Sequence, residues 1–237
     1  LRLKIGSRAE DSKIIKPGEV ISFNLILIGR ATEYLPYFIY TFDELGRLGI
    51  GRGRGRYRLI EVKKWKKDNG GWKIEETPVY TAQDKTIRQT PAEKIELPED
   101  FRPSEILDSL TLRFITPLRI KYNRDLVVRP DFHIFIRNLL RRLGLLYYFH
   151  CGNNKPSWDH RAIISHAEKV EIQSSSLKWR DWERYSSRQD TRMKLGGIVG
   201  EITYHGNIEP FLQIIEAGEV LHAGKGTSFG LGRYEIA

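Results

Sequence analysis

A glycine-rich segment near the C-terminus carries side chains that are suited to holding phosphate. It spans residues 224–232 and reads GKGTSFGLG; we call it the glycine loop. Glycines let the backbone approach a ligand closely and turn its N–H groups toward an anion. Lys225 adds a positive charge, and the hydroxyls of Thr227 and Ser228 add donors of the kind that phosphates attract. The segment lacks the Walker pattern, so it is not a P-loop. The alternative to phosphate binding is a purely structural role, as a tight connection between a helix and a strand.

A second segment, 49–56, alternates glycine with arginine and favours the phosphate interpretation of both. We call it the arginine loop; it contains Arg52, Arg54 and Arg56. Arginine suits planar, bidentate contacts with phosphate oxygens. Arg56 and Arg233 have an alternative structural role, since each stands at the start of a predicted closing strand.

Histidines are the natural candidates for proton transfer near neutral pH. His222 stands directly before the glycine loop and is the catalytic candidate within the chain, although its equivalent in the repeat described below is Leu45, which favours a packing role. The other five are assigned to helix ends, loops and a strand end: His133, His150, His160, His166 and His205. No histidine has metal-ligand spacing with cysteines or carboxylates, so we predict neither a metal site nor a cofactor.

The two loops belong to an internal repeat with an offset of 177 residues. The pattern Gly-x-Gly-Arg-Tyr-x-(Leu/Ile) occurs at 53–59 and again at 230–236. The same register pairs Gly29 with Gly206, Leu35 with Leu212, and Gly49 with Gly226. The repeated unit is predicted to be strand, helix, glycine-rich loop and strand, and in the first copy residues 21–28 (ISFNLILI) predict a buried strand.

The remaining elements predict an α+β fold with two ferredoxin-like domains in tandem. After the first copy, a turn at 68–71 (DNGG) predicts a hairpin. The second domain is predicted as strand 110–120, helix 132–149 capped by Asp131, strands 170–180 and 196–204, helix 208–221 and strand 231–236. This is the β-α-β-β-α-β order of the split βαβ motif.

The predicted domains have the following boundaries. Residues 1–82 form the C-terminal half of a first ferredoxin-like domain with an added hairpin, 83–108 a proline-containing linker, and 109–237 a complete second domain. The repeat offset places the opening half of the first domain, roughly 70 residues, upstream of Leu1.

The amino-acid composition limits the kinds of partner that the protein can bind. The net charge is +9, and nine basic residues but one acid lie between Arg47 and Lys67. Such clustering indicates a polyanion, most often nucleic acid, although a charged thermophile surface is the alternative. No apolar run is long enough to cross a bilayer, so no membrane partner is expected. A single cysteine, Cys151, excludes an internal disulfide and favours a reducing, cytoplasmic setting.

The C-terminal segment LHAGKGTSFGLGRYEI resembles the glycine-rich signature of the RAMP superfamily of CRISPR-associated proteins, and within it the endoribonucleases that process CRISPR precursor RNA. Further stretches are similar to that type: LTLRFITPLRIK (110–121), the run from Trp179 to Gln189, LGGIVGEITYHG (195–206) and residues 20–62. The resemblance implies two ferredoxin-like domains and metal-independent cleavage of CRISPR repeat RNA that leaves a 2′,3′-cyclic phosphate. It also places the catalytic histidine in the first helix of the first domain, upstream of Leu1 by the repeat offset.

On the basis of this resemblance, ten basic and hydroxyl-bearing residues are predicted to contact RNA. They are Arg52, Arg54, Arg56, Arg119, Arg184, Ser187, Arg188, Lys225, Thr227 and Ser228. Trp182 is an open candidate for base stacking, whereas Trp179 is assigned to core packing. The alternative function is a non-catalytic RAMP-type subunit that holds CRISPR RNA together with other effector subunits. A third is a ferredoxin-like RNA-binding domain outside CRISPR biology.

Overall fold

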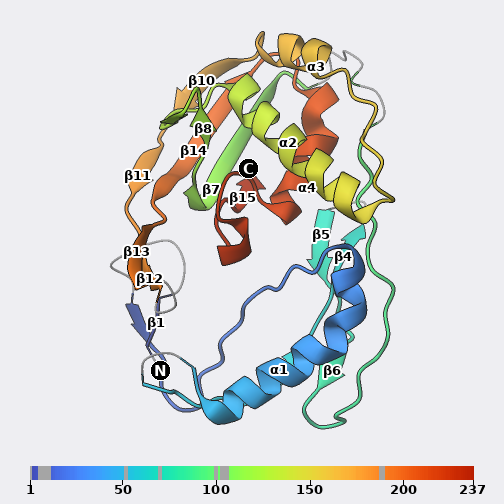
Figure 1. The fold of residues 1–237 in the computed structure, drawn as a ribbon, viewed down its shortest axis with the longest axis vertical. Helices are drawn as coiled ribbons and strands as arrows, with labels where there is room; N and C mark the ends of the chain where they lie inside the picture. The colour runs from blue at the N-terminus through green and yellow to red at the C-terminus, as the bar shows by residue number, and fades with distance from the viewer. Residues whose placement is uncertain are drawn as a thin grey trace. The chain divides into compact units, whose positions relative to one another are not determined.

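The computed structural model describes residues 2–4, 12–50, 53–68, 71–98, 101, 107–186 and 190–237. These residues fall into two compact units (Figure 1). Unit 1 comprises 2–4 and 12–95, and unit 2 continues from Glu96 to the C-terminus. The division lies inside the segment 83–108, and the predicted domain boundaries stay a prediction.

Unit 2 is built on an antiparallel sheet. Its strands are β7 (Ser109–Leu118), β10 (Glu171–Ser175), β11 (Lys178–Arg180), β14 (Gly197–His205) and β15 (Tyr234–Ile236). Their order across the sheet is β10-β14-β7-β15, with β11 also paired to β14, and every pairing is antiparallel. The predicted strands near 110, 196 and 231 are therefore confirmed, while the strand predicted at 170–180 is divided in two.

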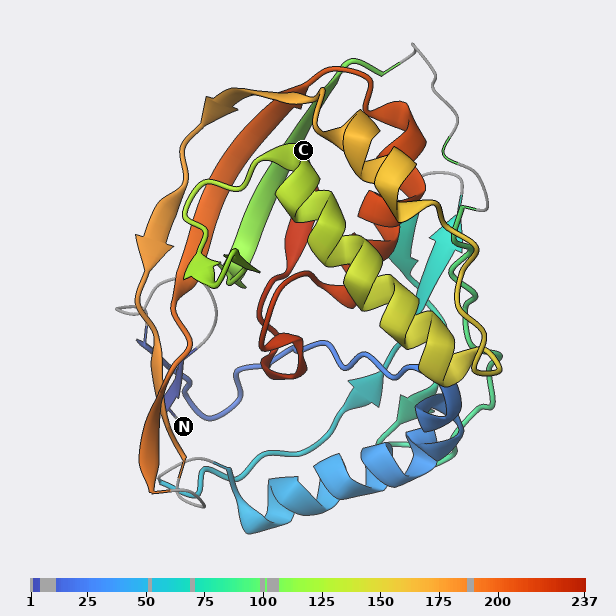
Figure 2. The ribbon, with the colours of Figure 1, turned by 45° about the horizontal axis from the view of Figure 1, so that its top comes forward.

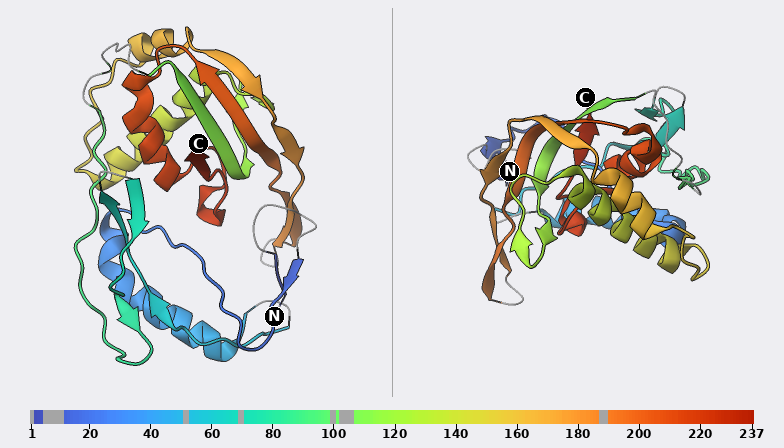
Figure 3. Two further views of the ribbon diagram at one scale, coloured as in Figure 1. Left: turned by 180° about the vertical axis from the view of Figure 1, so that it is seen from behind. Right: turned by 90° about the horizontal axis from the view of Figure 1, so that it is seen from above.

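Helices cover one face of this sheet (Figure 1 and Figure 3). They are α2 (Phe132–His150) and α4 (Leu212–Leu221), with the short α3 (His160–Ala167) packed on α2. The ring of Phe132 lies 5.1 Å, centroid to centroid, from the rings of both Tyr204 and Phe211. The core is thus an aromatic layer between sheet and helices: Phe114, Phe132, Phe135, Tyr204, Phe211 and Tyr234 are all buried.

Alternation along β7 places polar side chains on the opposite face of the sheet. There Arg113 pairs with Glu201 at 2.6 Å, and the Thr111 and Thr203 hydroxyls lie 2.9 Å apart. The charge of Arg113 is therefore partly neutralised by a carboxylate of the neighbouring strand β14.

Two hairpins and two short turns complete unit 2. The hairpins are β8 (Lys121–Tyr122) with β9 (Asp125–Leu126), and β12 (Glu183–Ser186) with β13 (Thr191–Lys194). The 3₁₀ turns are η2 (Glu209–Phe211) and η3 (Thr227–Phe229). Asp131 occupies the N-cap position of α2 with an extended backbone, as predicted. Its side chain makes no capping hydrogen bond.

Unit 1 contains one long helix and small two-stranded sheets. The turn η1 (Gly29–Tyr34) leads into α1 (Leu35–Leu48), which confirms the helix predicted in the first copy of the repeat; its apolar residues Leu35, Phe38, Ile39, Phe42 and Leu45 have the three- and four-residue spacing of one helix face. The sheets pair β1 (Arg2–Lys4) with β2 (Ser12–Ile14), β3 (Glu61–Val62) with β6 (Tyr80–Thr81), and β4 (Trp65–Asp68) with β5 (Gly71–Ile74). The last pair is the hairpin predicted around 68–71.

The buried strand predicted at 21–28 is wrong. These residues form no strand, and the side chains of Phe23, Leu25 and Ile26 are exposed. A strand needs a partner for its backbone N–H and C=O groups. Among the described residues none pairs with this segment, and the apolar pattern alone does not supply that ladder.

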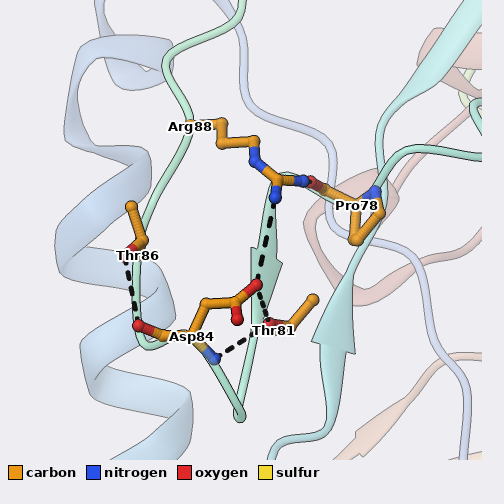
Figure 4. A network of polar contacts seen from close by, with 5 residues as sticks. All are labelled: Pro78, Thr81, Asp84, Thr86 and Arg88. Atoms are coloured by element: carbon orange, nitrogen blue, oxygen red, sulfur yellow. Dashed lines mark hydrogen bonds and ion pairs between the residues drawn. The ribbon is translucent and has the colours of Figure 1, made fainter.

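Within unit 1, a polar network joins residues 78–88 to one another (Figure 4). The Thr81 hydroxyl donates to Asp84 and accepts from the Asp84 N–H, and Arg88 donates to the Pro78 carbonyl at 3.1 Å. The first part of the predicted linker is therefore held by unit 1. In the described part of the chain, no helix has the length and apolar character to cross a membrane.

Candidate functional site

The glycine loop joins α4 to β15 and is dark red in Figure 2. Four of its glycines have φ between 72° and 78°, the left-handed region that side chains disfavour: Gly224, Gly226, Gly230 and Gly232. A Cβ at Gly232 would lie 1.7 Å from the Ala223 carbonyl oxygen, and one at Gly224 would lie 2.8 Å from that of Arg119. The sequence thus needs glycine here for backbone reasons.

Main-chain atoms of neighbouring elements hold the loop in place. The Lys225 N–H donates to the Arg119 carbonyl at 2.9 Å, and the Gly232 N–H to the Pro117 carbonyl at 3.1 Å. Two side chains join them, because Asn138 of α2 accepts from the Gly224 N–H at 2.8 Å and the Thr116 hydroxyl of β7 donates to the Gly230 carbonyl at 2.9 Å. The loop is therefore pre-formed against the end of β7 and the middle of α2.

Donors at the tip of the loop remain available. The N–H groups of Gly226, Thr227 and Ser228 have no hydrogen-bond partner among the residues that the structure describes. Lys225 and Ser228 are exposed and Thr227 is partly exposed. Lys225 also lacks an ion-pair partner within the described residues, so a charge and several donors face solvent together.

Arg119 supports the glycine loop through both its side chain and its backbone. Its Nη1 donates to the carbonyls of Lys194 and Gly196, at 3.2 and 3.1 Å. Together with its own carbonyl, which accepts from Lys225, it ties the loop to the start of β14. Its guanidinium is partly occupied by these bonds, and contact with RNA stays a prediction.

His222 is partly enclosed at the junction of α4 and the loop. Its φ is 63°, and its Nδ1 is buried without a hydrogen-bond partner in the described residues. Burial is the main cause that lowers the pKa of this imidazole, and the positive charges of Arg142 and Arg233 act in the same direction. Arg142 itself donates to the Leu221 carbonyl at 2.6 and 2.9 Å, closing the end of α4.

In the arginine loop of unit 1 the chain reverses direction in a tight turn. Ile50 and Gly55 exchange two backbone hydrogen bonds of 3.0 Å, and Arg54 occupies the left-handed region at φ 44°. Arg54 and Arg56 are exposed and have no ion-pair partner among the described residues. Arg52 lies outside the described residues.

Arg58 is a candidate that the sequence prediction missed. Exposure alternates from 54 to 58, so Arg54, Arg56 and Arg58 are exposed while Gly55 and Tyr57 are less so. The period-two run RGRYR is the signal that could have found it.

The repeat is visible in the contacts of two tyrosines. The Tyr57 hydroxyl donates to the Phe42 carbonyl of α1 at 2.6 Å, and the Tyr234 hydroxyl donates to the Ile215 carbonyl of α4. The arginines before them differ. Arg56 is unpaired among the described residues, while Arg233 is bound to Glu235 at 2.7 Å.

The predicted basic turn is only partly described. The backbone of Arg184 belongs to β12, while Ser187 and Arg188 lie outside the described residues. Of the predicted contacts, the structure brings Arg119, Lys225, Thr227 and Ser228 together at one loop of unit 2, and Arg54 and Arg56 at one loop of unit 1.

A family of known proteins matches the segment that contains the glycine loop. The sequence profile of the family described as CRISPR-associated endoribonuclease Cas6 matches residues 112–234, just over half of the chain and including the whole glycine loop. A second profile, described as an N-terminal domain, matches residues 5–92. The chain therefore belongs to the CRISPR-associated endoribonuclease Cas6 family.

Individual relatives are distant. An uncharacterized protein of Archaeoglobus fulgidus is 24% identical over 212 residues, covering 89% of this chain, and the chain spans 64% of that protein's length. Among solved structures, Thermus thermophilus Cas6 is 17% identical over 55% of this chain and 53% of its own, with a TM-score of 0.42. A Cas6 product complex is 22% identical over 57% of this chain and 54% of its own, with a TM-score of 0.38.

Proposed function

We propose that the protein binds CRISPR repeat RNA and cleaves it without a metal ion to make guide RNA. The ribose 2′-oxygen attacks the adjacent phosphorus, the bond from phosphorus to the 5′-oxygen breaks, and a 2′,3′-cyclic phosphate and a 5′-hydroxyl remain. This reaction needs a base for the 2′-OH, an acid for the leaving 5′-oxygen, and donors for the charge that develops on phosphorus. Family membership supports the reaction class.

One observation carries the proposal at the level of the site. Inside the family-matched segment, the pre-formed glycine loop exposes Lys225 and Ser228 and contains three N–H groups, of Gly226, Thr227 and Ser228, without a hydrogen-bond partner among the described residues. Preorganised donors of this kind stabilise charge on a phosphate because they need no rearrangement when it arrives. Lys225, Thr227 and Ser228 are therefore the proposed phosphate contacts.

The enzyme claim is tested with purified protein and the repeat RNA in EDTA. We expect a single site-specific cut whose 5′ fragment ends in a cyclic phosphate, identified by its mass and by its resistance to phosphatase until acid opens the ring. Bound but uncut RNA under these conditions would contradict the enzyme claim and leave the binding claim standing.

The loop is tested by replacing Lys225 and Ser228 together with alanine. Because both side chains are exposed, we expect RNA affinity to fall by about tenfold or more while the melting temperature changes little. Filter binding and thermal unfolding of the same preparations measure the two effects. A large loss of melting temperature with unchanged affinity would assign the loop a structural role instead.

A second candidate function is favoured by His222. The buried, unpartnered Nδ1 of this in-chain histidine is poorly placed to exchange a proton with a ribose. The alternative is a non-catalytic subunit that holds CRISPR RNA together with other effector proteins. The EDTA assay separates the two functions, because a non-catalytic subunit binds repeat RNA and leaves it uncut. If the wild-type protein cuts, His222→Gln tests this residue: loss of cutting with retained binding makes it catalytic, whereas unchanged cutting assigns catalysis to another residue.

We also propose that both units are related to the ferredoxin-like fold. In unit 2 the order β7-α2-β10-β14-α4-β15, with α3 inserted, and the sheet order β10-β14-β7-β15 agree with a split βαβ domain. In unit 1, α1 begins at Leu35 and α4 at Leu212, which is the repeat offset. An experimental structure in which the two tyrosine-anchored helices and their loops fail to superpose would contradict the tandem arrangement.

A further inference from the structure

An open recess lies at the edge of the unit 2 sheet. Its volume is about 440 Å³, and its lining comes from the segment before α2 and from β10–β11: Val128, Arg129, Ser175, Leu177 and Trp179. This volume is within the range of about 300–1,000 Å³ that is typical of small-ligand pockets. We call it the Trp179 recess.

Trp179 is exposed here, which corrects the packing role predicted from the sequence. Its side chain stands opposite Ile198 in the β11–β14 pairing, and the residue is 39% exposed. The indole N–H donates to the Asp181 carboxylate at 2.9 Å. That bond fixes the orientation of the ring and uses its polar edge, so the apolar face of the indole is the part left for a ligand.

The other lining residues add a charge and apolar surface. Arg129 is exposed and has no ion-pair or hydrogen-bond partner among the described residues. Val128 is 60% exposed, an unusual position for a branched apolar residue beside a tryptophan ring. Ser175 contributes an exposed hydroxyl. No acidic residue lines the recess within the described part of the chain.

We infer that the Trp179 recess binds one unpaired nucleotide of the RNA, with its base stacked on the Trp179 indole and its phosphate held by Arg129. A flat aromatic face beside a free arginine matches the two chemically distinct parts of a nucleotide. The aromatic rings of β7, β14 and β15 (Phe114, Tyr204 and Tyr234) are buried, so Trp179 of β11 offers the exposed aromatic face that these strands lack. The inference rests on the proposed RNA-binding function and adds a second contact point to it.

The experiment separates base contact from phosphate contact. The probes are a labelled, unstructured RNA decamer and a decamer of the same length in which every base is replaced by an abasic ribose. Stacking is worth about 5- to 150-fold in affinity for one base. We therefore expect Trp179→Ala to weaken binding of the ordinary decamer by this factor and to leave binding of the abasic decamer unchanged.

Two more variants complete the design. Trp179→Phe keeps an aromatic face and should retain most of the affinity, with a melting temperature like that of the wild-type protein. Arg129→Ala should weaken both decamers and reduce the slope of log affinity against log salt by about 0.7. Phe149→Ala is the control, because this exposed aromatic lies at the other end of α2, about 26 Å along the helix from Phe132.

The outcomes distinguish the two claims. If the wild-type protein binds the ordinary decamer but Trp179→Ala binds it equally well, the recess is not a base site and the proposed function is unaffected. Equal weakening of both decamers by Trp179→Ala would also overturn the inference, since it would indicate a general loss of structure. If the wild-type protein binds neither the decamers nor repeat RNA, the proposed function fails as well.

Discussion

His222 lies next to the glycine loop, but its side chain is partly buried in the fold. It ends α4 in a left-handed conformation, directly before the glycine loop, and its Nδ1 is buried. The guanidinium of Arg142, which closes α4, adds positive charge nearby. A protonated imidazole would bring a further charge into this position, so the fold favours the neutral form.

The lowered pKa of His222 predicts a pH dependence of stability. In the unfolded chain the imidazole titrates near its ordinary value of 6.5, while in the folded protein it titrates lower. The folded state is therefore favoured fully above pH 6.5, and this contribution is lost as the pH falls through the folded value, by up to ~1.4 kcal/mol per pH unit.

The measurement is the free energy of unfolding in urea at pH 7.5 and pH 5. His222→Leu should reduce the difference between the two pH values relative to the wild-type protein. His205→Gln, at the exposed end of β14, is the control for replacing a histidine outside the loop. An unchanged pH difference in His222→Leu would contradict the buried, neutral imidazole.

Single side chains were predicted unevenly from the sequence. Lys225 and Ser228 were predicted as RNA contacts because the glycine-rich segment around them is typical of a loop; both are exposed, and their contact with RNA stays a prediction. Trp179 was assigned to the core because an aromatic residue in a strand usually packs, but it lies on an edge strand at a place that is open to solvent. Exposure of this kind depends on what covers a strand, which no local pattern encodes.

The glycine loop is the element whose backbone is most constrained. Gly232 and Gly230 both have positive φ, 72° and 75°, yet their surroundings differ. An added Cβ at Gly232 would meet the Ala223 carbonyl oxygen at 1.7 Å, whereas nothing lies within 4 Å of one at Gly230.

These two glycines form a matched pair for a stability test. Gly230→Ala should cost about 1–2 kcal/mol, the price of a left-handed conformation alone. Gly232→Ala adds a backbone collision and should cost more than about 3 kcal/mol. Chemical denaturation of both variants gives the comparison, and similar losses would show that the close approach at Gly232 relaxes without cost.

Helices with strong periodicity and most of the strands were predicted well, whereas the strand at 21–28 was not. The three- and four-residue spacing of apolar residues located α1 and α2, because one face of a helix carries its own pattern and its own hydrogen bonds. Residues 21–28 have the composition of a buried strand, but a strand is completed only by its neighbours, and the described residues supply none.

Charge is divided unequally along the whole molecule. Residues 1–95 contain 19 basic and 12 acidic residues, a net charge of +7, while residues 96–237 carry 20 and 18, a net charge of +2. In unit 2 several arginines are paired with carboxylates or carbonyls, as Arg113 and Arg119 are. Long-range attraction of RNA is therefore expected to depend mainly on unit 1.

This division predicts which variants change the salt dependence of RNA binding. Replacing Arg54, Arg56 and Arg58 with alanine should lower the slope of log affinity against log salt by about 2, if each contacts one phosphate of a single strand. Arg113→Ala is the control, because that side chain is already paired with Glu201. Affinity titrations between 50 and 300 mM salt, roughly the range in which counterion release dominates, measure both slopes. An equal change in the two variants would contradict the assignment.

The way the glycine loop is held has a consequence for how its specificity can change over evolution. Its supports are the carbonyls of Pro117 and Arg119, the hydroxyl of Thr116 and the amide of Asn138, and none of them is a side chain of residues 225, 227 or 228. Positions 225, 227 and 228 can then vary without loss of the loop's shape. The same scaffold is suited to acquiring a new RNA preference, in nature or by directed exchange of three side chains.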